Sequence, residues 1–408
     1  MNSSKSALGS IPVLFISCAV FLFGALALTV SSGYTYGPAL LFLLALGYLF
    51  VRPYPTLEAQ DKLIVAALLI YFLTGVVTNL VHHLPSNTYD NFSRFLLAIP
   101  VSLLLLRFPI KAVFLWSGIA CGAIGAALVA TIDFYVQGDG RAGGYNNPIQ
   151  FGDIAMLFAC LLLVGFSWAR QHSKLVTVVF VLGIASGIFA SLLSGSRGGW
   201  IALPFACGLF YIANDLHKNI RQSFVFAGLL IALVVVVYLF QQSGFLQMRI
   251  HEAVSDLQQY TQAQNANSSL GIRFTLWQSG LHLAAQHPWL GWGSVANYVL
   301  ISGDSSFVFQ HFNHFHNEFL DAMVKRGIAG VLALMVIYCL PALLFYRQLK
   351  QSSAAAKPLA LAGCMLVLAT FVFGLTQSFF SHSSGVMVYA FMLVILWSQV
   401  RTAAIRHE

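Results

Sequence analysis

Long apolar runs separated by short polar connections alternate along most of the chain. A helix needs about 20 predominantly apolar residues to cross the hydrocarbon of a bilayer, and twelve of these runs are candidate spans. The runs lack the alternation of apolar and polar residues typical of barrel strands, and a helix satisfies its backbone amides within one segment. We therefore predict an all-α polytopic membrane protein with about 12 transmembrane helices in one integral membrane domain, residues 1–408. The predicted spans lie near residues 11–30, 35–51, 63–81, 92–106, 111–132, 150–169, 175–193, 199–213, 223–240, 322–346, 358–377 and 384–400.

One long interruption, residues 241–316, separates the ninth predicted span from the tenth. Apolar residues recur within it twice at the spacing of one helical face, which is typical of amphipathic helices that lie on a membrane surface. We expect this large loop to contain two such helices and to be functional, because loops of this length are uncommon in compact proteins. The two apolar stripes are Leu246, Ile250, Val254 and Leu257, and then Phe274, Trp277, Leu281 and Ala285.

The composition agrees with a membrane protein, since 58% of the residues are hydrophobic and only 8% are charged, against about 25% charged in soluble domains. When the N-terminus is placed in the cytoplasm, fourteen of the 21 Lys and Arg residues fall on the inner side and seven on the outer side. This bias predicts that both termini are cytoplasmic and that the 241–316 loop lies outside. The net charge of +8 then needs no nucleic-acid partner, because no basic and aromatic binding pattern accompanies it.

The outer positive charges are arginines with one exception, Lys325. A guanidinium presents a rigid fork of donors that matches a phosphate, so this selection indicates a bound oxyanion. Arg197 lies in a Gly-Ser turn between two apolar runs, Arg273 opens a predicted loop helix, and Arg141 lies in a turn-rich segment beside Asp139. Anchoring at lipid headgroups, solvation at a helix start and pairing with Asp139 are the respective structural alternatives. The outer arginines are Arg94, Arg141, Arg197, Arg249, Arg273 and Arg326.

A histidine cluster follows the loop: His311, His314 and His316, with Glu318. The spacing does not put three imidazoles on one helical face, and no His-Glu-x-x-His or Asp-x-Asp pattern is present, so we expect no metal site. A purely structural set of interfacial histidines remains an alternative. We interpret His316 as a general base, with His314 as its rival, because an imidazole exchanges protons near neutral pH. Neither a Gly-x-Ser-x-Gly elbow nor a phosphate-binding Gly-Lys-Ser loop occurs, so a hydrolase or a nucleotide-driven pump is not favoured.

Several of these segments together resemble the O-antigen ligase family within the ligase and polymerase superfamily of membrane glycosyltransferases. The family signature is a histidine, a small polar residue, nine positions and Gly-x-x-Gly. The matching pieces here are His316-Asn317 with Gly327-Ile-Ala-Gly330, the Ser-Arg-Gly-Gly-Trp turn of Arg197, the Arg273-x-x-x-Trp277 helix with Pro288 and Gly291-x-Gly293, and Arg141 with Asn147-Pro148.

The resemblance implies transfer of a glycan from undecaprenyl diphosphate to lipid A–core oligosaccharide at the periplasmic face of the bacterial inner membrane, without a metal or other cofactor. It implies catalytic roles for His316, Arg197 and Arg273. Substrate-binding roles are expected for Arg141, His314, Asn317 and Trp277. The alternatives are an O-antigen polymerase or a protein O-oligosaccharyltransferase, which share the donor, and a lipid-linked glycan transporter, for which charges within spans and related halves would be expected.

Overall fold

The computed structural model describes residues 3–51, 54–213, 255, 269–302, 311–351 and 356–405. In these ranges the chain forms helices and no strand, which confirms the all-α prediction. The α-helices are α1 (Ser3–Leu26), α2 (Gly33–Tyr48), α3 (Ala59–Val81), α4 (Asp90–Arg107), α5 (Ala112–Thr131), α6 (Pro148–Val164), α7 (Phe166–His172), α8 (Lys174–Ser194), α9 (Arg197–Trp200), α10 (Ala202–Ala213), α13 (Ser269–Gln286), α14 (Val295–Ser302), α16 (Glu318–Gln351), α17 (Lys357–Gly374) and α18 (Ser383–Ile405). Short 3-10 turns, η1 (Ser86–Tyr89) and η4 (Phe379–Ser381), and a π-turn, η2 (Ile132–Val136), complete the described set.

A helix occupies every predicted span except 223–240, which lies outside the described residues. Seven of the described helices are long and apolar enough to cross a membrane, and an eighth span results if α6 and α7, bent by 54° at Gly165, are taken together. The count of about 12 spans therefore stays a prediction.

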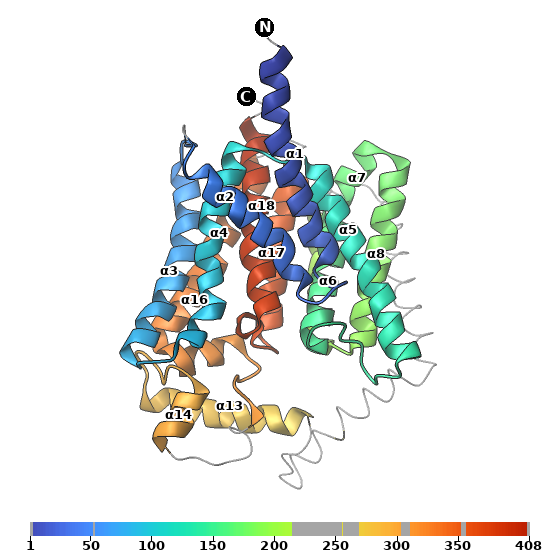
Figure 1. The fold of residues 1–408 in the computed structure, drawn as a ribbon. Coiled ribbons are helices and arrows are strands. Elements are labelled where there is room, and N and C mark those ends of the chain that lie inside the picture. The colour runs from blue at the N-terminus through green and yellow to red at the C-terminus, as the bar shows by residue number, and fades with distance from the viewer. Residues whose placement is uncertain are drawn as a thin grey trace.

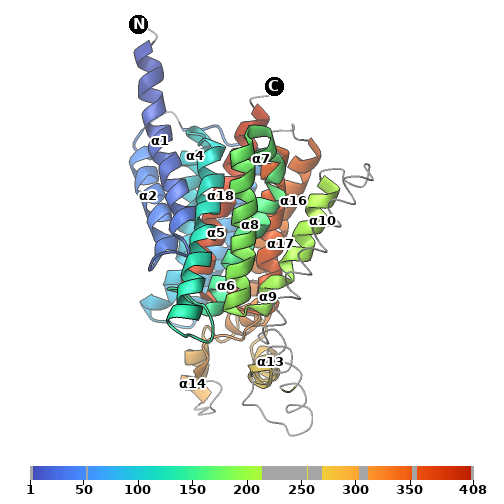
Figure 2. The ribbon, with the colours of Figure 1, turned by 90° about the vertical axis from the view of Figure 1, so that its right-hand side faces the viewer.

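The two ends of the bundle differ (Figure 1). Both chain termini lie at one end, and α13 and α14 lie beyond the other. A view turned by 90° looks along α13, so this helix runs crosswise to the long helices (Figure 2). The predicted helix containing Leu246 to Leu257, and Arg249 within it, lie outside the described residues.

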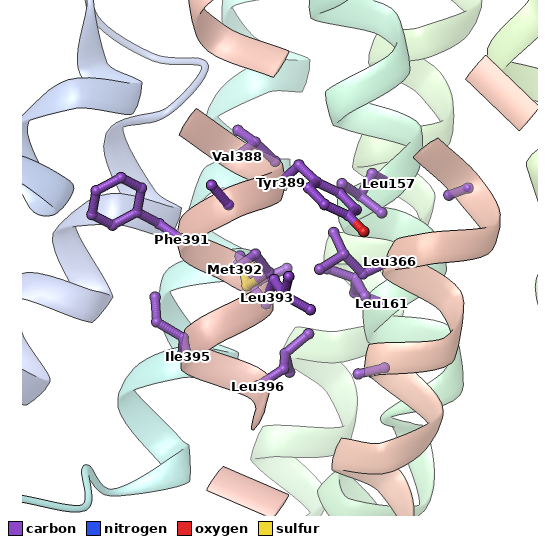
Figure 3. Packing of buried hydrophobic residues seen from close by; sticks show 14 of the residues in the cluster. Leu157, Leu161, Leu366, Val388, Tyr389, Phe391, Met392, Leu393, Ile395 and Leu396 are labelled. Carbon is purple, nitrogen blue, oxygen red and sulfur yellow. The ribbon is translucent and has the colours of Figure 1, made fainter. Parts of the chain in front are cut away.

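Helix α18 forms the centre of the bundle and is buried on all sides, since residues 386 to 396 are each at most 4% exposed. Its apolar residues face several neighbours at once, which is why its sequence shows no polar face. Figure 3 shows Leu157 and Leu161 of α6 and Leu366 of α17 beside Tyr389 and Leu393 of α18. This core fixes the ends of α6, α17 and α18, and these ends carry the polar groups described below.

A buried ionic contact joins α3 to α18 at the end of the bundle that holds the termini. Asp61 is 2% exposed, and its Oδ1 accepts hydrogen bonds from Trp397 Nε1 at 2.8 Å and from Arg401 Nε at 3.1 Å. Arg401 also pairs with Glu58, the N-cap residue of α3. Because the carboxylate is removed from water, these donors replace its hydration and tie the two helices together.

Two glycine segments of the sequence signature meet at a kink in α16. Gly327 has φ 64° and ψ −157°, a conformation that disfavours any residue with a Cβ, and an added Cβ would collide with the backbone of Trp289. Gly291 has φ 67° and abuts the carbonyl of Val324 in the same way. Ile328 N donates to Pro288 O at 2.7 Å across this joint. The glycines therefore allow the segment after α13 to lie against the backbone of α16.

The buried face of α13 differs from the predicted stripe. Leu276, Leu283 and Ala284 are buried in a small hydrophobic cluster with Phe315, whereas Leu281 is 66% exposed. The helix turns the adjacent set of positions inward because Gly280 allows close contact with the ring of Phe315. The helix itself was predicted correctly, and its contact face was displaced by about one position.

Candidate active site

His316 lies in the loop that precedes α16 and has a positive φ of 49°, which is uncommon for a residue other than glycine. Its Nδ1 is 2.6 Å from Oε1 of Gln377, a fully buried residue just after α17. An amide oxygen only accepts hydrogen bonds, so Nδ1 carries the ring proton and Nε2 keeps its lone pair. The Nε2 of Gln377 in turn lies 3.0 Å from Nε2 of His382. Gln377 therefore fixes both the orientation and the tautomer of His316.

The local environment keeps these histidines neutral. Burial lowers the pKa of His316; its hydrogen bond to Gln377 acts in the opposite direction, and the charge of Arg273 lowers the pKa further. Burial, helped by His316, lowers the pKa of His314 to about 3 and that of His382 to about 4. At neutral pH His316 therefore has a free lone pair on Nε2, as a general base requires.

His314 packs against His316. Its ring centroid lies 4.4 Å from that of His316 and 5.2 Å from that of His382. Its Nδ1 is buried and has no hydrogen-bond partner among the described residues. Burial makes His314 a weak base, and the hydrogen bond to Gln377 distinguishes His316 from it.

Two other predicted site residues hold the loop. Asn317 is the N-cap of α16: its Oδ1 accepts from the amides of Phe319 and Leu320, both at 3.0 Å, and its Nδ2 donates to the carbonyl of Leu375. Trp277 Nε1 donates to the carbonyl of Phe315 at 2.9 Å. Their polar side-chain atoms are thus occupied by the protein backbone. Gln377, and neither Asn317 nor Glu318, makes the side-chain hydrogen bond that orients the imidazole.

Two buried carboxylates brace the same loops from behind. Asp321 Oδ1 accepts from the amide of Phe315 at 3.2 Å, and its Oδ2 accepts from Ser381 Oγ at 3.0 Å. Glu318 Oε2 accepts from the amide of Phe380 at 2.8 Å. The first turn of α16 therefore joins the His316 loop to the segment between α17 and α18 that carries Gln377.

The predicted arginines lie within electrostatic range of one another or of a shared aspartate, and Arg273 is also within range of His316. Arg273, near the start of α13, interacts electrostatically with His316, with Arg197 and with Asp153 of α6. Arg141 interacts with Asp153 as well, and its Nε donates to the carbonyl of Ser194 at 2.8 Å. Burial and the neighbouring Arg197 lower the pKa of Arg273, an effect that Asp153 opposes. We call Arg141, Arg197 and Arg273 the arginine cluster; its guanidiniums converge from three segments distant in sequence.

The glycines of the Arg197 turn allow this convergence. An added Cβ on Gly198 would collide with the side chain of Thr376, and one on Gly199 would come within 2.5 Å of Asp153 Oδ1. Ser196 Oγ donates to the same oxygen of Asp153 at 2.5 Å. The turn therefore lies between α6 and the segment that carries Gln377. Arg197 is thus close in the fold to the segment whose Gln377 side chain orients His316.

Sequence reasoning missed Gln377 and Asp153. Asp153 is fully buried within an apolar run, and an ionisable residue at such depth is by itself a signal of function. Gln377 lies in the polar triplet Thr376-Gln377-Ser378 at the end of a predicted span, where the sequence gives no reason to choose it over its neighbours. Only the packing of α17 against the His316 loop identifies it.

Comparison with known proteins agrees with the sequence resemblance. Residues 182–335 match the family model described as O-antigen ligase. The chain is 28% identical over 385 residues to an uncharacterized protein of Haemophilus influenzae, covering 92% of this chain and 95% of that protein. It is 25% identical over 172 residues to an O-antigen ligase of Escherichia coli K12, covering 39% of each chain. Arg197, Arg273 and His316 fall inside the family match, whereas Arg141, Asp153 and Gln377 lie outside it.

Proposed function

We propose that this membrane protein transfers a glycan from undecaprenyl diphosphate to lipid A–core oligosaccharide, because residues 182–335 match the family model described as O-antigen ligase. The observation that carries the proposal is the position of His316, whose tautomer leaves Nε2 free and which lies within electrostatic reach of Arg273. The free Nε2 suits an acceptor hydroxyl, and Arg273 is close enough to act on the same imidazole electrostatically.

The arginine cluster suits the diphosphate of the donor. Arg197 and Arg273 repel each other when no anion lies between them. A bound diphosphate would offset this repulsion and accept charge-assisted hydrogen bonds from both guanidiniums. Charge grows on the diphosphate oxygen as the glycosidic bond breaks, and guanidiniums already in place stabilise it. Asp153 and the Ser194 carbonyl hold the arginines in position.

The reaction is a single displacement. The acceptor hydroxyl oxygen bonds to the anomeric carbon as His316 Nε2 takes the hydroxyl proton, and the bond from that carbon to the diphosphate oxygen breaks with its electron pair on undecaprenyl diphosphate. Attack from the face opposite the leaving group inverts the anomeric configuration. General-base assistance of this kind contributes about 10²–10⁴-fold to rate.

The activity would operate at the periplasmic face of the bacterial inner membrane. The positive-inside bias supports cytoplasmic termini, and the site is at the opposite end of the bundle from them (Figure 1). A site at this end of the bundle would lie at a membrane surface, where the bilayer presents the head groups of lipid-linked substrates.

The test uses purified, folded protein with a lipid-linked glycan and three acceptors in separate reactions: lipid A–core, a second lipid-linked glycan and a protein. Transfer to lipid A–core that is lost in His316→Ala, and retained in His314→Ala and in the exposed control His282→Ala, supports the proposal. Full activity of His316→Ala contradicts the base assignment, and transfer only to another acceptor replaces the ligase. Loss of activity on chelation would overturn metal independence.

A further inference from the structure

A second polar cavity lies at the same end of the bundle as His316, on the other side of its supporting loops. Its volume is about 290 Å³, and it is enclosed by α3, α4, the start of α14 and the first turns of α16. In Figure 1, α3 and α6 stand on opposite sides of the bundle, so this cavity and the arginine cluster flank the His316 loop. We call it the Arg326 cavity; the lining residues used below are Tyr71, Asn91, Phe92, Glu318, Asp321 and Arg326.

Arg326 provides an unsatisfied donor in this cavity. Its guanidinium lies 4.8 Å from the ring centroid of Tyr71 and 5.5 Å from that of Phe92, a cation–π arrangement that holds it flat. Its Nη1 is buried and has no hydrogen-bond partner among the described residues. The guanidinium also contacts the Tyr71 hydroxyl, so one of its donors, Nη1, is left unsatisfied. Leaving a donor of a charged group buried without an acceptor is costly, and the arrangement therefore suits an anionic group that enters from outside.

The remaining wall suits hydroxyl groups. Glu318 and Asp321 are only 3% and 5% exposed, and both line the cavity with carboxyl oxygens. Glu318 uses Oε2 for the amide of Phe380, which leaves Oε1 for a ligand, whereas Asp321 already accepts from Phe315 N, Ser381 Oγ and Lys325 Nζ and keeps one acceptor position. Asn91 of α4 keeps one amide N–H for a ligand, because its Nδ2 donates once, to Ser381 O, while its Oδ1 accepts from Arg94 and Ser383. The two aromatic rings form an apolar side. Carboxyl groups, an amide and an aromatic ring face around one cavity are typical contacts of a bound sugar. An acyl chain is disfavoured here because it would lie against buried charged and polar groups. A volume near the lower limit of small-molecule sites, about 300 Å³, suits one sugar unit.

The cavity is coupled directly to the catalytic loop. Asp321 lines the cavity, and its Oδ1 accepts a hydrogen bond from the amide of Phe315, the residue before His316. Glu318 likewise lines it and holds the amide of Phe380. A sugar bound there would therefore be separated from the imidazole by the thickness of one loop.

We propose that the Arg326 cavity is the acceptor subsite and binds a sugar that carries a phosphate or carboxylate, with the anion on Arg326 and the hydroxyls on Glu318, Asp321 and Asn91. This rests on the proposed function, in which the arginine cluster takes the donor. The anionic groups of the two substrates thus bind at separate cationic sites. The arginine cluster holds the diphosphate of the donor, and Arg326 orients the acceptor relative to His316.

The experiment separates donor from acceptor. Arg326→Gln removes the fork, Arg326→Lys keeps the charge, and Ala296→Phe narrows the cavity from an exposed wall position. Ala285→Phe, an exposed alanine on α13, is the matched control. The Michaelis constant of each substrate is measured with the other saturating, and thermal unfolding checks that each variant is folded.

We expect Arg326→Gln and Ala296→Phe to raise the KM for a phosphorylated acceptor about tenfold or more, with the donor KM changed less than about twofold. Arg326→Lys should recover part of the loss, Ala285→Phe should behave as wild type, and dephosphorylating the acceptor should remove the effect of Arg326→Gln. An unchanged acceptor KM in both cavity variants, or a raised donor KM, overturns the inference while leaving the proposed function standing.

A binding measurement keeps the inference independent of catalysis. Wild-type protein is titrated with a phosphorylated core oligosaccharide freed of its lipid, and with phosphatidylglycerol in nanodiscs as the other source of an anionic polyol headgroup. Saturable binding of the oligosaccharide that Arg326→Gln weakens about tenfold supports the subsite, even where no transfer is seen and the proposed function fails. Binding of the phospholipid alone, weakened by the same variant, overturns it.

Discussion

The most informative single substitution is Gln377→Leu, because Gln377 touches the base and not the reacting atoms. The amide is fully buried, and its Oε1 accepts from His316 Nδ1 at 2.6 Å. Leucine fills a similar volume and offers no acceptor, so the substitution removes the hydrogen bond with little change in packing. The imidazole keeps its place in the loop, but it loses the group that selects the tautomer.

The expected loss follows from the change in charge on the imidazole. A neutral hydrogen bond contributes about 0.5–1.5 kcal/mol, and one to a charged group about 1.5–3 kcal/mol. His316 is neutral in the ground state and becomes an imidazolium as it takes the proton, so the bond to Gln377 strengthens by about 0.5–2 kcal/mol in the transition state. That difference corresponds to a fall in kcat of roughly 2- to 30-fold. The KM values should change little.

The pH profile gives a second readout that a structural role would not produce. The hydrogen bond from His316 to Gln377 raises the pKa of His316 against the effect of burial, so its removal lowers that pKa. A general base works only when unprotonated, and the acidic limb of kcat/KM should therefore move to lower pH in Gln377→Leu. Gln377→Glu should move it to higher pH, because a carboxylate stabilises the imidazolium.

The assay is glycan transfer by purified protein across the acidic range, with Gln348→Leu as the control. Gln348 also makes a side-chain hydrogen bond, to Gln60 at 2.7 Å, but at the end of the bundle that holds the chain termini, away from His316. Its loss should leave the profile unchanged. An acidic limb that stays in place in both Gln377 variants, with kcat at the wild-type level, would refute the tautomer argument.

Three further predictions concern the anion site and the scaffold. Arg273→Lys keeps the charge but loses the fork, so kcat/KM for the donor should fall about tenfold or more in a steady-state assay; wild-type turnover would argue against bidentate holding. Gly327→Ala should destabilise the folded protein by several kcal/mol, because alanine is strained at φ 64° and its Cβ would collide with the backbone of Trp289. The control Gly47→Ala, whose Cβ would lie in open space within a helix, should stabilise the protein by up to about 1 kcal/mol. Equal thermal unfolding temperatures for the two variants contradict this. Asp61→Ala leaves Arg401 without its buried carboxylate and should cost about 3–5 kcal/mol in denaturant unfolding, and a loss below about 1 kcal/mol would show that water compensates.

The helical architecture was readable from the sequence because membrane helices depend on a property that single segments express. Each apolar run must satisfy its own backbone, and the structure has a helix at every predicted span that it describes. Which face of a helix is buried depends on its neighbours instead. That is why α13 was predicted as a helix while its inward positions were misassigned, with Leu281 left exposed.

The site was partly readable for the same reason. Arginine and histidine are conspicuous in an apolar chain because burying them is costly. In the structure Arg273 interacts electrostatically with His316 and with Arg197, and Asp153 links Arg273 to Arg141. The residue that orients the imidazole is a neutral amide 61 positions away, and its role exists only through the packing of α17 against the loop. Asn317 shows the converse, since its place beside the histidine suggested chemistry, but its atoms cap a helix.

The moderate effect expected for Gln377→Leu, against the large one for loss of His316, follows from how the loop is held. A non-glycine residue at φ 49° carries backbone strain of order 1–3 kcal/mol and persists only where the surroundings over-determine it. Asn317 caps the helix that follows. Asp321 accepts from the backbone N–H of Phe315, the residue before His316, and Trp277 donates to the backbone carbonyl of Phe315. These contacts persist without Gln377, so the imidazole stays near the arginine cluster and only its tautomer and basicity change. Catalysis should therefore depend on Gln377 through proton affinity, and on the backbone anchors through position.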